Sequence, residues 1–151
     1  MGIHETAELE NITLAHGSSS PAVEIREYVT VHDSSIGSDS RIYERVSIKK
    51  SDIGESVDIN ANTYVENAQV GDRVQIGPNA SVVGVTHDLT EEDMEHRNDV
   101  FEEIVIEPGA FVGASAVVLP DIHIGENAVI GANVTVTEDV PAGTVVRGTR
   151  E

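Results

Sequence analysis

Residues 104–136 read IVIEPGAFVGASAVVLPDIHIGENAVIGANVTV, and an aliphatic side chain recurs in this stretch at every sixth position. The same pattern occurs earlier in the chain with two steps of six and one of five, so that Ile36, Ile53 and Val70 lie seventeen residues apart. The series comprises Ile25, Val31, Ile36, Ile42, Ile48, Ile53, Ile59, Val65, Val70, Ile76, Val82, Ile106, Val112, Val118, Ile124, Ile130 and Val136. A period of six cannot keep one side of an α-helix apolar, because a helix completes a turn in about 3.6 residues. The pattern therefore predicts short strands joined by turns.

Residues that favour turns occupy fixed places in each six-residue repeat, or hexad. Glycine directly follows the aliphatic residue at Gly37, Gly54, Gly71, Gly77, Gly113, Gly125 and Gly131. Three places after the aliphatic residue come Asp39, Asn62, Asn79, Gly109, Asp121, Asn127, Asn133 and Asp139, the residue types that best tolerate a positive φ at a corner. Three hexads then close one triangular coil of 17 or 18 residues. Stacked coils that cover one another's strand edges form a parallel β-helix.

Composition narrows the functional classes. The chain has 151 residues, of which 39% are hydrophobic and 3% aromatic, and it contains no cysteine. It can form a core of Val, Ile and Ala, whereas disulfides, thiolate metal sites and a cysteine nucleophile are excluded. Nine Lys and Arg against 27 Asp and Glu give a net charge of −18, which disfavours binding to a nucleic-acid backbone.

The same charge bears on the environment of the protein. An acidic surface of this kind repels itself in dilute buffer and is better tolerated where salt screens it, so we expect a halophilic protein. The alternative is an ordinary acidic cytosolic protein. The N-terminal residues MGIHETAELE include no apolar segment, and no apolar run reaches membrane-spanning length. We therefore expect a cytoplasmic protein without a membrane partner.

The repeat is interrupted once, between Val82 and Glu103, by a polar stretch rich in Asp and Glu. A regular solenoid gains no stability from such a segment, and a long loop in a compact fold is a functional candidate. His87 lies where this loop begins. The alternative is a tolerated surface insertion.

The pattern Ile-Gly-x-x-Ala/Val-x resembles that of the hexapeptide-repeat acyltransferases over about residues 36–148. This resemblance implies an all-β fold, a single-stranded left-handed parallel β-helix with one ejected loop. It also implies a homotrimer with active sites in the clefts between subunits. We expect an N-terminal segment or cap over residues 1–24 and a β-helix domain over residues 25–151 with a loop at 88–103.

The segment IGPNASVVGVTHD, residues 76–88, is similar to the region of the sugar O-acetyltransferases that holds their catalytic histidine. The resemblance implies that His87 is a general base that deprotonates an acceptor hydroxyl, which attacks the thioester of acetyl-CoA. A histidine suits this task because its ordinary pKa lies near neutrality. The expected reaction is acetyl transfer to a hydroxyl or amino group of a sugar or similar small acceptor. Acetyl-CoA is the expected donor, and no metal is expected.

Further site residues follow from the same resemblance. Asn60 matches an acceptor-binding asparagine, and Phe111 stands where relatives carry a Trp beside the site. The small residues that match the groove for the pantetheine arm are Gly77, Ala114, Ala132 and Thr137. Glu138 replaces a lysine that relatives place near the CoA phosphates, and Arg147 and Arg150 are expected to bind these phosphates instead.

The repeat register makes one more prediction. If residues 88–105 are ejected, His123 falls at the same corner as His87 one coil later, with coils about 4.8 Å apart. His123 is therefore a candidate for substrate binding. A histidine pair can also bind a metal, which leaves open an enzyme resembling the γ-type carbonic anhydrases. Those enzymes include a His-x4-His spacing, which no pair among His4, His16, His32, His87, His96 and His123 provides. A third possibility is a non-catalytic trimeric solenoid.

Overall fold

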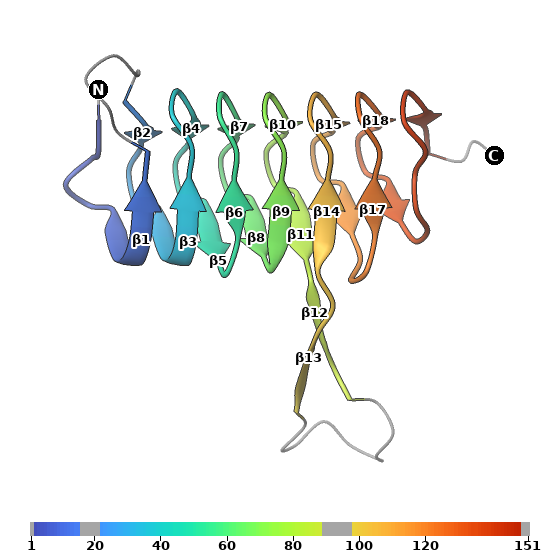
Figure 1. Ribbon diagram of the computed structural model, residues 1–151, viewed down its shortest axis with the longest axis horizontal. Coiled ribbons are helices and arrows are strands. Elements are labelled where there is room, and N and C mark those ends of the chain that lie inside the picture. The colour runs from blue at the N-terminus through green and yellow to red at the C-terminus, as the bar shows by residue number, and fades with distance from the viewer. Residues whose placement is uncertain (1, 16–21, 89–97, 149–151) are drawn as a thin grey trace.

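The computed structural model describes residues 2–15, 22–88 and 98–148. These residues contain strands and turns but no helix, and hence no helix long and apolar enough to cross a membrane. The strands wind into stacked coils with three flat faces, and the coils follow one another along the long axis of the body (Figure 1). The pairing is parallel throughout the body. The predicted parallel β-helix is confirmed.

Three faces make up the body. The first contains β2 (Glu24–Ile25), β4 (Arg41–Ile42), β7 (Asp58–Ile59), β10 (Gln75–Ile76), β15 (Phe111–Val112), β18 (Val129–Ile130) and β20 (Val145–Val146). The second contains β5 (Ser47–Lys49), β8 (Tyr64–Glu66), β11 (Ser81–Val83), β16 (Val117–Val118) and β19 (Thr135–Val136). The third contains β6 (Asp52–Ile53), β9 (Ala68–Val70), β14 (Ile104–Ile106) and β17 (His123–Ile124). Strand β3 (Thr30–Ile36) pairs with β5 and also with β6, and so joins the second and third faces.

The N-terminal segment adds strand β1 (Glu8–Leu14), which pairs in parallel with β3. A bridge between Ile3 and Ile25 begins the first face. The side chains of Leu9, Ile12 and Leu14 pack against the core. Residues 2–14 thus cover the first coil by continuing the solenoid.

The core is a set of aliphatic columns that run through the coils. On the first face the register stacks Ile25, Ile42, Ile59, Ile76, Val112, Ile130 and Val146 in adjacent strands. All seventeen aliphatic residues of the predicted series are buried. Each side chain therefore packs on the same position of the coils before and after it, which is why aliphatic side chains of similar size repeat along each column.

The corners use left-handed backbone as predicted, with one exception. Asp39, Asn62, Asn79, Gly109, Asp121, Asn127 and Asn133 all have a positive φ between 58° and 77°. Asp139 does not, and its carboxylate instead accepts a hydrogen bond from the backbone N–H of His123 at 2.8 Å. The strict hexad ends at Val136, so the last corner turns at Gly143, where φ is 69°.

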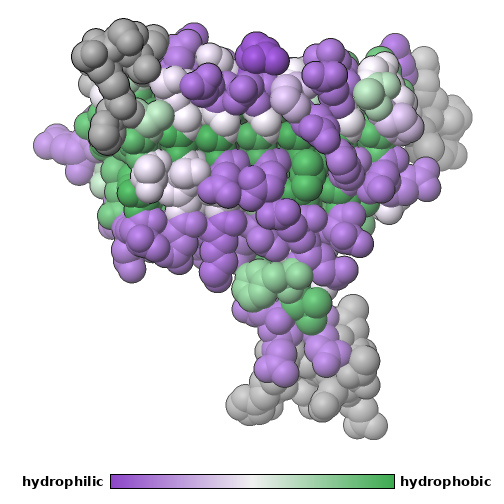
Figure 2. Space-filling view, viewed as in Figure 1, coloured by the Kyte–Doolittle hydropathy of each residue, from purple (hydrophilic) through white to green (hydrophobic). Residues whose placement is uncertain are grey.

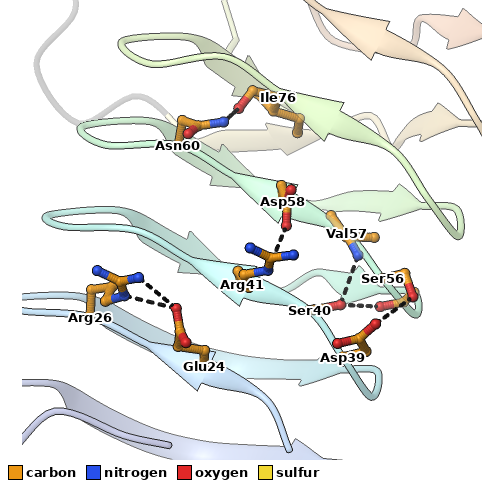
Figure 3. Close-up of polar contacts among 11 residues, drawn as sticks. Glu24, Arg26, Asp39, Ser40, Arg41, Ser56, Val57, Asp58, Asn60 and Ile76 are labelled. Atoms are coloured by element: carbon orange, nitrogen blue, oxygen red, sulfur yellow. Dashed lines mark hydrogen bonds and ion pairs between the residues drawn. The ribbon is translucent and has the colours of Figure 1, made fainter. Parts of the chain in front are cut away.

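Buried hydroxyl groups complete the corners of the N-terminal half. Ser40 Oγ donates to the carbonyl of Gly54 and accepts from the N–H of Val57 one coil later, at 2.9 and 3.0 Å (Figure 3). Thr63 makes the same pair of bonds. Ser34 and Ser51 also accept from a backbone N–H one coil later, but they donate to carbonyls of their own coil, those of His32 and Lys49. The residue one coil before Ala128 is an alanine and has no hydroxyl group. The N–H of Ala128 therefore donates within its own turn, to the carbonyl of Gly125 at 3.1 Å. Either arrangement satisfies the buried donor.

The insertion leaves the body as a hairpin. Strands β12 (Val85–His87) and β13 (Asp99–Phe101) pair in antiparallel fashion and project from the middle of the body (Figure 1). The hairpin starts at Val85, three residues before the loop predicted at 88–103, and residues 89–97 lie outside the described part. Its base exposes apolar surface (Figure 2), to which Val100 and Phe101 contribute with 37% and 48% exposure.

The coils stack so closely that we expect a side chain to destabilise the fold at those glycines that lie against the backbone of the next coil. A Cβ at Gly37 would lie 2.6 Å from the carbonyl carbon and oxygen of Gly54, which are backbone atoms of the next coil. We expect Gly37→Ala to lower the free energy of unfolding by about 1–3 kcal/mol, the usual cost of overpacking. Urea denaturation in strong salt measures it. Gly148→Ala is the control, because a Cβ there meets no atom within 4 Å; equal stability of the two variants would contradict the packing argument.

Candidate functional site

A groove of about 500 Å³ lies where the hairpin leaves the second face. It is lined by Lys49, Tyr64, Glu66, Val83, Val85, Thr86, His87 and Asp99. The chain turns out of the body at Gly84, where a Cβ would lie 2.4 Å from the carbonyl oxygen of Asn67. Asn67 also donates its side-chain amide to the carbonyl of Gly84 at 2.8 Å. The absence of a side chain at Gly84 therefore lets the hairpin start directly beside strand β8.

His87 is held against Asp99 by the hairpin. The two residues are opposite one another in the β12–β13 register, and Nδ1 of His87 lies 3.2 Å from Oδ1 of Asp99. Both side chains are about half exposed, at 53% and 56%. A carboxylate at Nδ1 favours the tautomer with its proton on that nitrogen, which leaves the lone pair on Nε2. The ring can therefore accept a proton at Nε2 while Asp99 stabilises the resulting charge.

Lys49, Tyr64 and Glu66 line the groove from strands β5 and β8 of the body. Lys49 and Glu66 are register partners on β5 and β8, and the Lys49 ammonium lies 5.6 Å from the centre of the Tyr64 ring. The Tyr64 hydroxyl donates a hydrogen bond to Oε1 of Glu66. Burial, together with this bond to the nearby carboxylate, raises the pKa of Tyr64 to about 12. Tyr64 thus stays protonated and fixes the position of Glu66.

Sequence reasoning missed these three residues and Asp99. A signal for two of them was present, because Lys49 and Glu66 are seventeen residues apart and Val83 follows after seventeen more. Val83 lies next to the interruption. Counting back from it by seventeen residues, and then by seventeen more, would have identified Glu66 and Lys49 as neighbours of the site. Asp99 had no such signal, since its position depends on the hairpin.

The predicted neighbourhood of His87 and His123 is wrong. Strand β14 re-enters the body on β9, so the register places His123 beside Val105, with Gln69 one coil earlier. His123 therefore belongs to the third face, whereas His87 is on the hairpin. Nε2 of His123 bonds Glu107 at 2.6 Å, in a separate open groove of about 670 Å³ near the C-terminal end. The described residues bring no three His, Asp or Glu side chains together as a metal site would require.

The structure does not bring Asn60 or Phe111 to the groove of His87. The Asn60 side chain donates to the carbonyl of Ile76 at 2.9 Å and so completes a corner beside the first face (Figure 3). Phe111 is on β15 of the first face with 41% of its surface exposed. Neither residue lines the groove that contains His87.

Four of the residues predicted to bind the donor follow one corner. The strand register aligns Gly77 with Gly113, Gly131 and Arg147 in successive coils, and Ala114 and Ala132 come one position later. A Cβ at Gly77 would lie 2.7 Å from the backbone nitrogen of Ala114. Thr137 lies elsewhere, in a groove of about 230 Å³ at the end of the solenoid that also includes Glu138 and Val146. Arg150 lies outside the described residues.

The raised pKa of Tyr64 gives a testable pH dependence. The ordinary value is 10.0 and the folded value about 12, so the folded chain keeps a proton that the unfolded chain loses between these two values. The stabilisation is complete below pH 10 and is lost as the pH rises toward 12. The ultraviolet absorbance that wild type has and Tyr64→Phe lacks reports ionisation of the Tyr64 hydroxyl, and it should titrate near pH 12. When both proteins also carry Glu66→Gln, the same difference should titrate at a lower pH. A wild-type difference that titrates at the ordinary value would contradict the burial of the hydroxyl.

Comparisons with known proteins agree with this architecture. Residues 103–138 match the family model described as bacterial transferase hexapeptide (six repeats). No curated protein matches the chain in sequence. Among solved structures, a candidate acetyltransferase of Bacillus cereus, the product of its BC4754 gene, superposes with a TM-score of 0.68 at 19% identity, over 93% of this chain and 78% of that one.

Two other solved structures extend the comparison. A variant of AntD, an N-acyltransferase from Bacillus cereus in complex with dTDP-4-amino-4,6-dideoxyglucose and coenzyme A, has a TM-score of 0.62 at 17% identity, over 95% of this chain and 73% of that one. WeeI from Acinetobacter baumannii has a TM-score of 0.62 at 20% identity, over 97% of this chain and 54% of that one. The chain folds as a left-handed parallel β-helix, and its residues 103–138 match the hexapeptide-repeat model.

Proposed function

We propose that the protein is a CoA-dependent acyltransferase that moves an acetyl group from acetyl-CoA to a hydroxyl or amino group of a sugar. The observation that carries this proposal is the His87–Asp99 pair at 3.2 Å beside an open groove. An imidazole with a carboxylate on one nitrogen and a lone pair on the other is the arrangement that general-base catalysis needs. The fold shared with AntD, which binds coenzyme A and an amino sugar linked to dTDP, supports the reaction class.

The residues of the groove suggest the order of events. Nε2 of His87 takes the proton of the acceptor hydroxyl or amine. At the same time, the oxygen or nitrogen of the acceptor forms a bond to the thioester carbonyl carbon. The carbon–sulfur bond then breaks, the thiolate of CoA leaves, and the imidazolium returns its proton to this sulfur. Asp99 stabilises the imidazolium while it exists. His87 ends neutral, and the products are the acetylated acceptor and free CoA.

We assign the acyl donor to the corner formed by Gly77, Ala114 and Ala132. Gly77 is buried, whereas Ala114 and Ala132 are not and have small side chains, so their backbone is accessible to amides of the pantetheine arm. Arg147, which follows Gly131 in the register column that begins at Gly77, would contact the phosphates. Thr137 and Glu138 are not part of this corner.

We also propose a homotrimer with a site between each pair of subunits. The flat faces of a triangular solenoid can pack around a threefold axis. Val100 and Phe101 at the base of the hairpin expose apolar surface that a neighbouring subunit would cover. Contact between the hairpin and a neighbour would also enclose the groove, which is open in the single chain.

Replacing the proposed base tests the mechanism. We expect His87→Ala to lower the turnover of acetyl-CoA with a sugar acceptor by about 10²–10⁴-fold, the usual contribution of a general base. Stability should change little, because the ring is half exposed. Release of CoA thiol measures turnover, and His4→Ala, at an exposed site near the N-terminus, is the matched control. Wild-type turnover in His87→Ala would remove His87 from the mechanism, and absence of turnover in the wild type would favour a non-catalytic solenoid.

The charge of −18 predicts that assembly and donor binding need salt. Repulsion among three acidic subunits, and between them and polyanionic CoA, extends over about 10 Å at 0.1 M salt but only about 3 Å at 1 M. We expect trimer formation to strengthen, and the apparent KM for acetyl-CoA to fall, between about 0.1 and 2 M KCl. Light scattering and initial rates measure the two effects. A trimer that persists at the lowest salt, with its highest donor affinity there, would contradict the halophilic character.

A further inference from the structure

The hairpin leaves the body at a corner whose residues form one register column. The strand register places Lys50, Asn67 and Gly84 at this corner in three successive coils. Asn67 fixes the start of the hairpin, because its side-chain amide donates to the carbonyl of Gly84 at 2.8 Å. The Lys50 ammonium reaches further along the hairpin and lies 4.8 Å from the centre of the Phe101 ring on β13. Two consecutive residues of the column therefore contact the hairpin.

The backbone conformation of Lys50 is unusual for a lysine. Asn11, Asp33 and Asn67 occupy the same corner position in neighbouring coils, and all four residues have a positive φ between 50° and 56°. Asn and Asp adopt this conformation more readily than lysine does. Strain of this kind persists where the surrounding structure holds the residue, and it is common at functional sites. A long side chain suits this position, because Gly84 lies two coil spacings, or about 10 Å, further along the column.

Phe101 is on the same side of the hairpin as the proposed catalytic pair. In the antiparallel register Phe101 is opposite Val85, and Asp99 is opposite His87. Side chains that are directly opposite, or two residues apart along one strand, project from the same side of a two-stranded sheet. Val85, His87 and Asp99 all line the groove. Lys50 therefore contacts the side of the hairpin that borders the groove, one residue pair before His87 and Asp99.

This contact acts on the hairpin as a unit. Backbone hydrogen bonds join Gly84 to Glu66 and Glu102 at the root of the hairpin. Beyond the root, no hydrogen bond or ion pair among the described residues joins β12 or β13 to the body. A two-stranded hairpin held only at its root has little to oppose a tilt. The His87–Asp99 pair lies within the hairpin and would move with it, without being broken.

We propose that Lys50 is a positioning residue that holds the hairpin, and with it the His87–Asp99 pair, in place at the groove. Lys50 does not line the groove, so it acts through Phe101 rather than on a substrate. The face of an aromatic ring attracts a cation without neutralising it, and arginine can replace lysine in such a contact. The effect of Lys50 on the reaction rests on the proposed acyl transfer, whereas its effect on the hairpin does not.

The position of the hairpin is measurable without any substrate. The chain has no cysteine, so the variant with Asn98→Cys and Gln75→Cys takes spin labels only beside β13 and on the exposed side of β10. Pulsed electron paramagnetic resonance in strong salt, with labelled chains diluted among unlabelled ones, gives the distance between the two labels within one chain. Lys50→Met keeps the length of the side chain and removes its charge, and it should broaden this distance distribution. Lys50→Arg should leave the distribution as in wild type.

Arg45→Met is the matched control. Arg45 is also exposed, has a φ of 59° and lies over an aromatic ring, that of Tyr28 at 5.2 Å, but it contacts no part of the hairpin. Its replacement should leave the label distances unchanged. Equal broadening in Arg45→Met and Lys50→Met would show a general effect of lost charge and would overturn the proposal. An unchanged distribution in Lys50→Met would overturn it as well.

Turnover is the second readout. We expect Lys50→Met to lower kcat with acetyl-CoA and a sugar by about two- to fivefold, the factor that one exposed cation–aromatic contact provides. The pH dependence of kcat should stay as in wild type, because the His87–Asp99 pair remains intact. Phe101→Leu should cause the same loss, and the double variant should lose no more than either single variant.

Wild-type kcat in Lys50→Met, or losses that add in the double variant, would remove Lys50 from the positioning of the pair. A changed pH dependence in Lys50→Met would also contradict the proposal, since it would mean that the pair itself is altered. Absence of CoA thiol release from every variant and from the wild type would contradict only the proposed acyl transfer. The label distances would then still decide whether Lys50 holds the hairpin.

Discussion

Each coil of this protein is held by the coils on either side of it, through backbone hydrogen bonds that run parallel to the solenoid axis and through columns of identical aliphatic positions. No coil contains enough apolar surface to form a core by itself. The column from Ile25 to Val146 exists only because every coil presents its residue at the same height and angle. This requirement explains the constant period, the corner residues with positive φ and the glycines whose neighbours leave no space for a Cβ.

The same constraint determines where a functional groove can form. A regular solenoid has flat faces, so an enclosed site needs an element that departs from the repeat. The hairpin β12–β13 is this element, and Gly84 is the point at which it departs. Its antiparallel register brings Asp99 to His87, while the regular coils supply Lys49, Tyr64 and Glu66 in positions determined by the repeat. The groove thus combines one irregular wall with one regular wall.

Most of the aromatic side chains of the protein lie beside basic side chains. Four of the five aromatic side chains, Tyr28, Tyr43, Tyr64 and Phe101, lie under a lysine or arginine. In a chain of net charge −18, these contacts hold basic groups in place on an acidic surface without requiring a carboxylate for each of them. Lys49 is the instance in which the held cation borders the groove, where it lies among the carboxylates of Glu66 and Asp99.

The repeat in the sequence was sufficient to predict the β-helix, its buried columns and most of its corners, because a period of six with glycine and asparagine at constant phase is compatible with few other folds. It also located His87 at the start of the insertion. The partner of His87 and the position of His123 could not be predicted this way, since both depend on how the chain leaves the repeat and where it re-enters. The hairpin leaves at Gly84 and β14 returns on β9, and this register places Asp99 at His87 and His123 on another face. Local periodicity determines what repeats, whereas the contacts of an insertion are decided only when its two ends join the folded body.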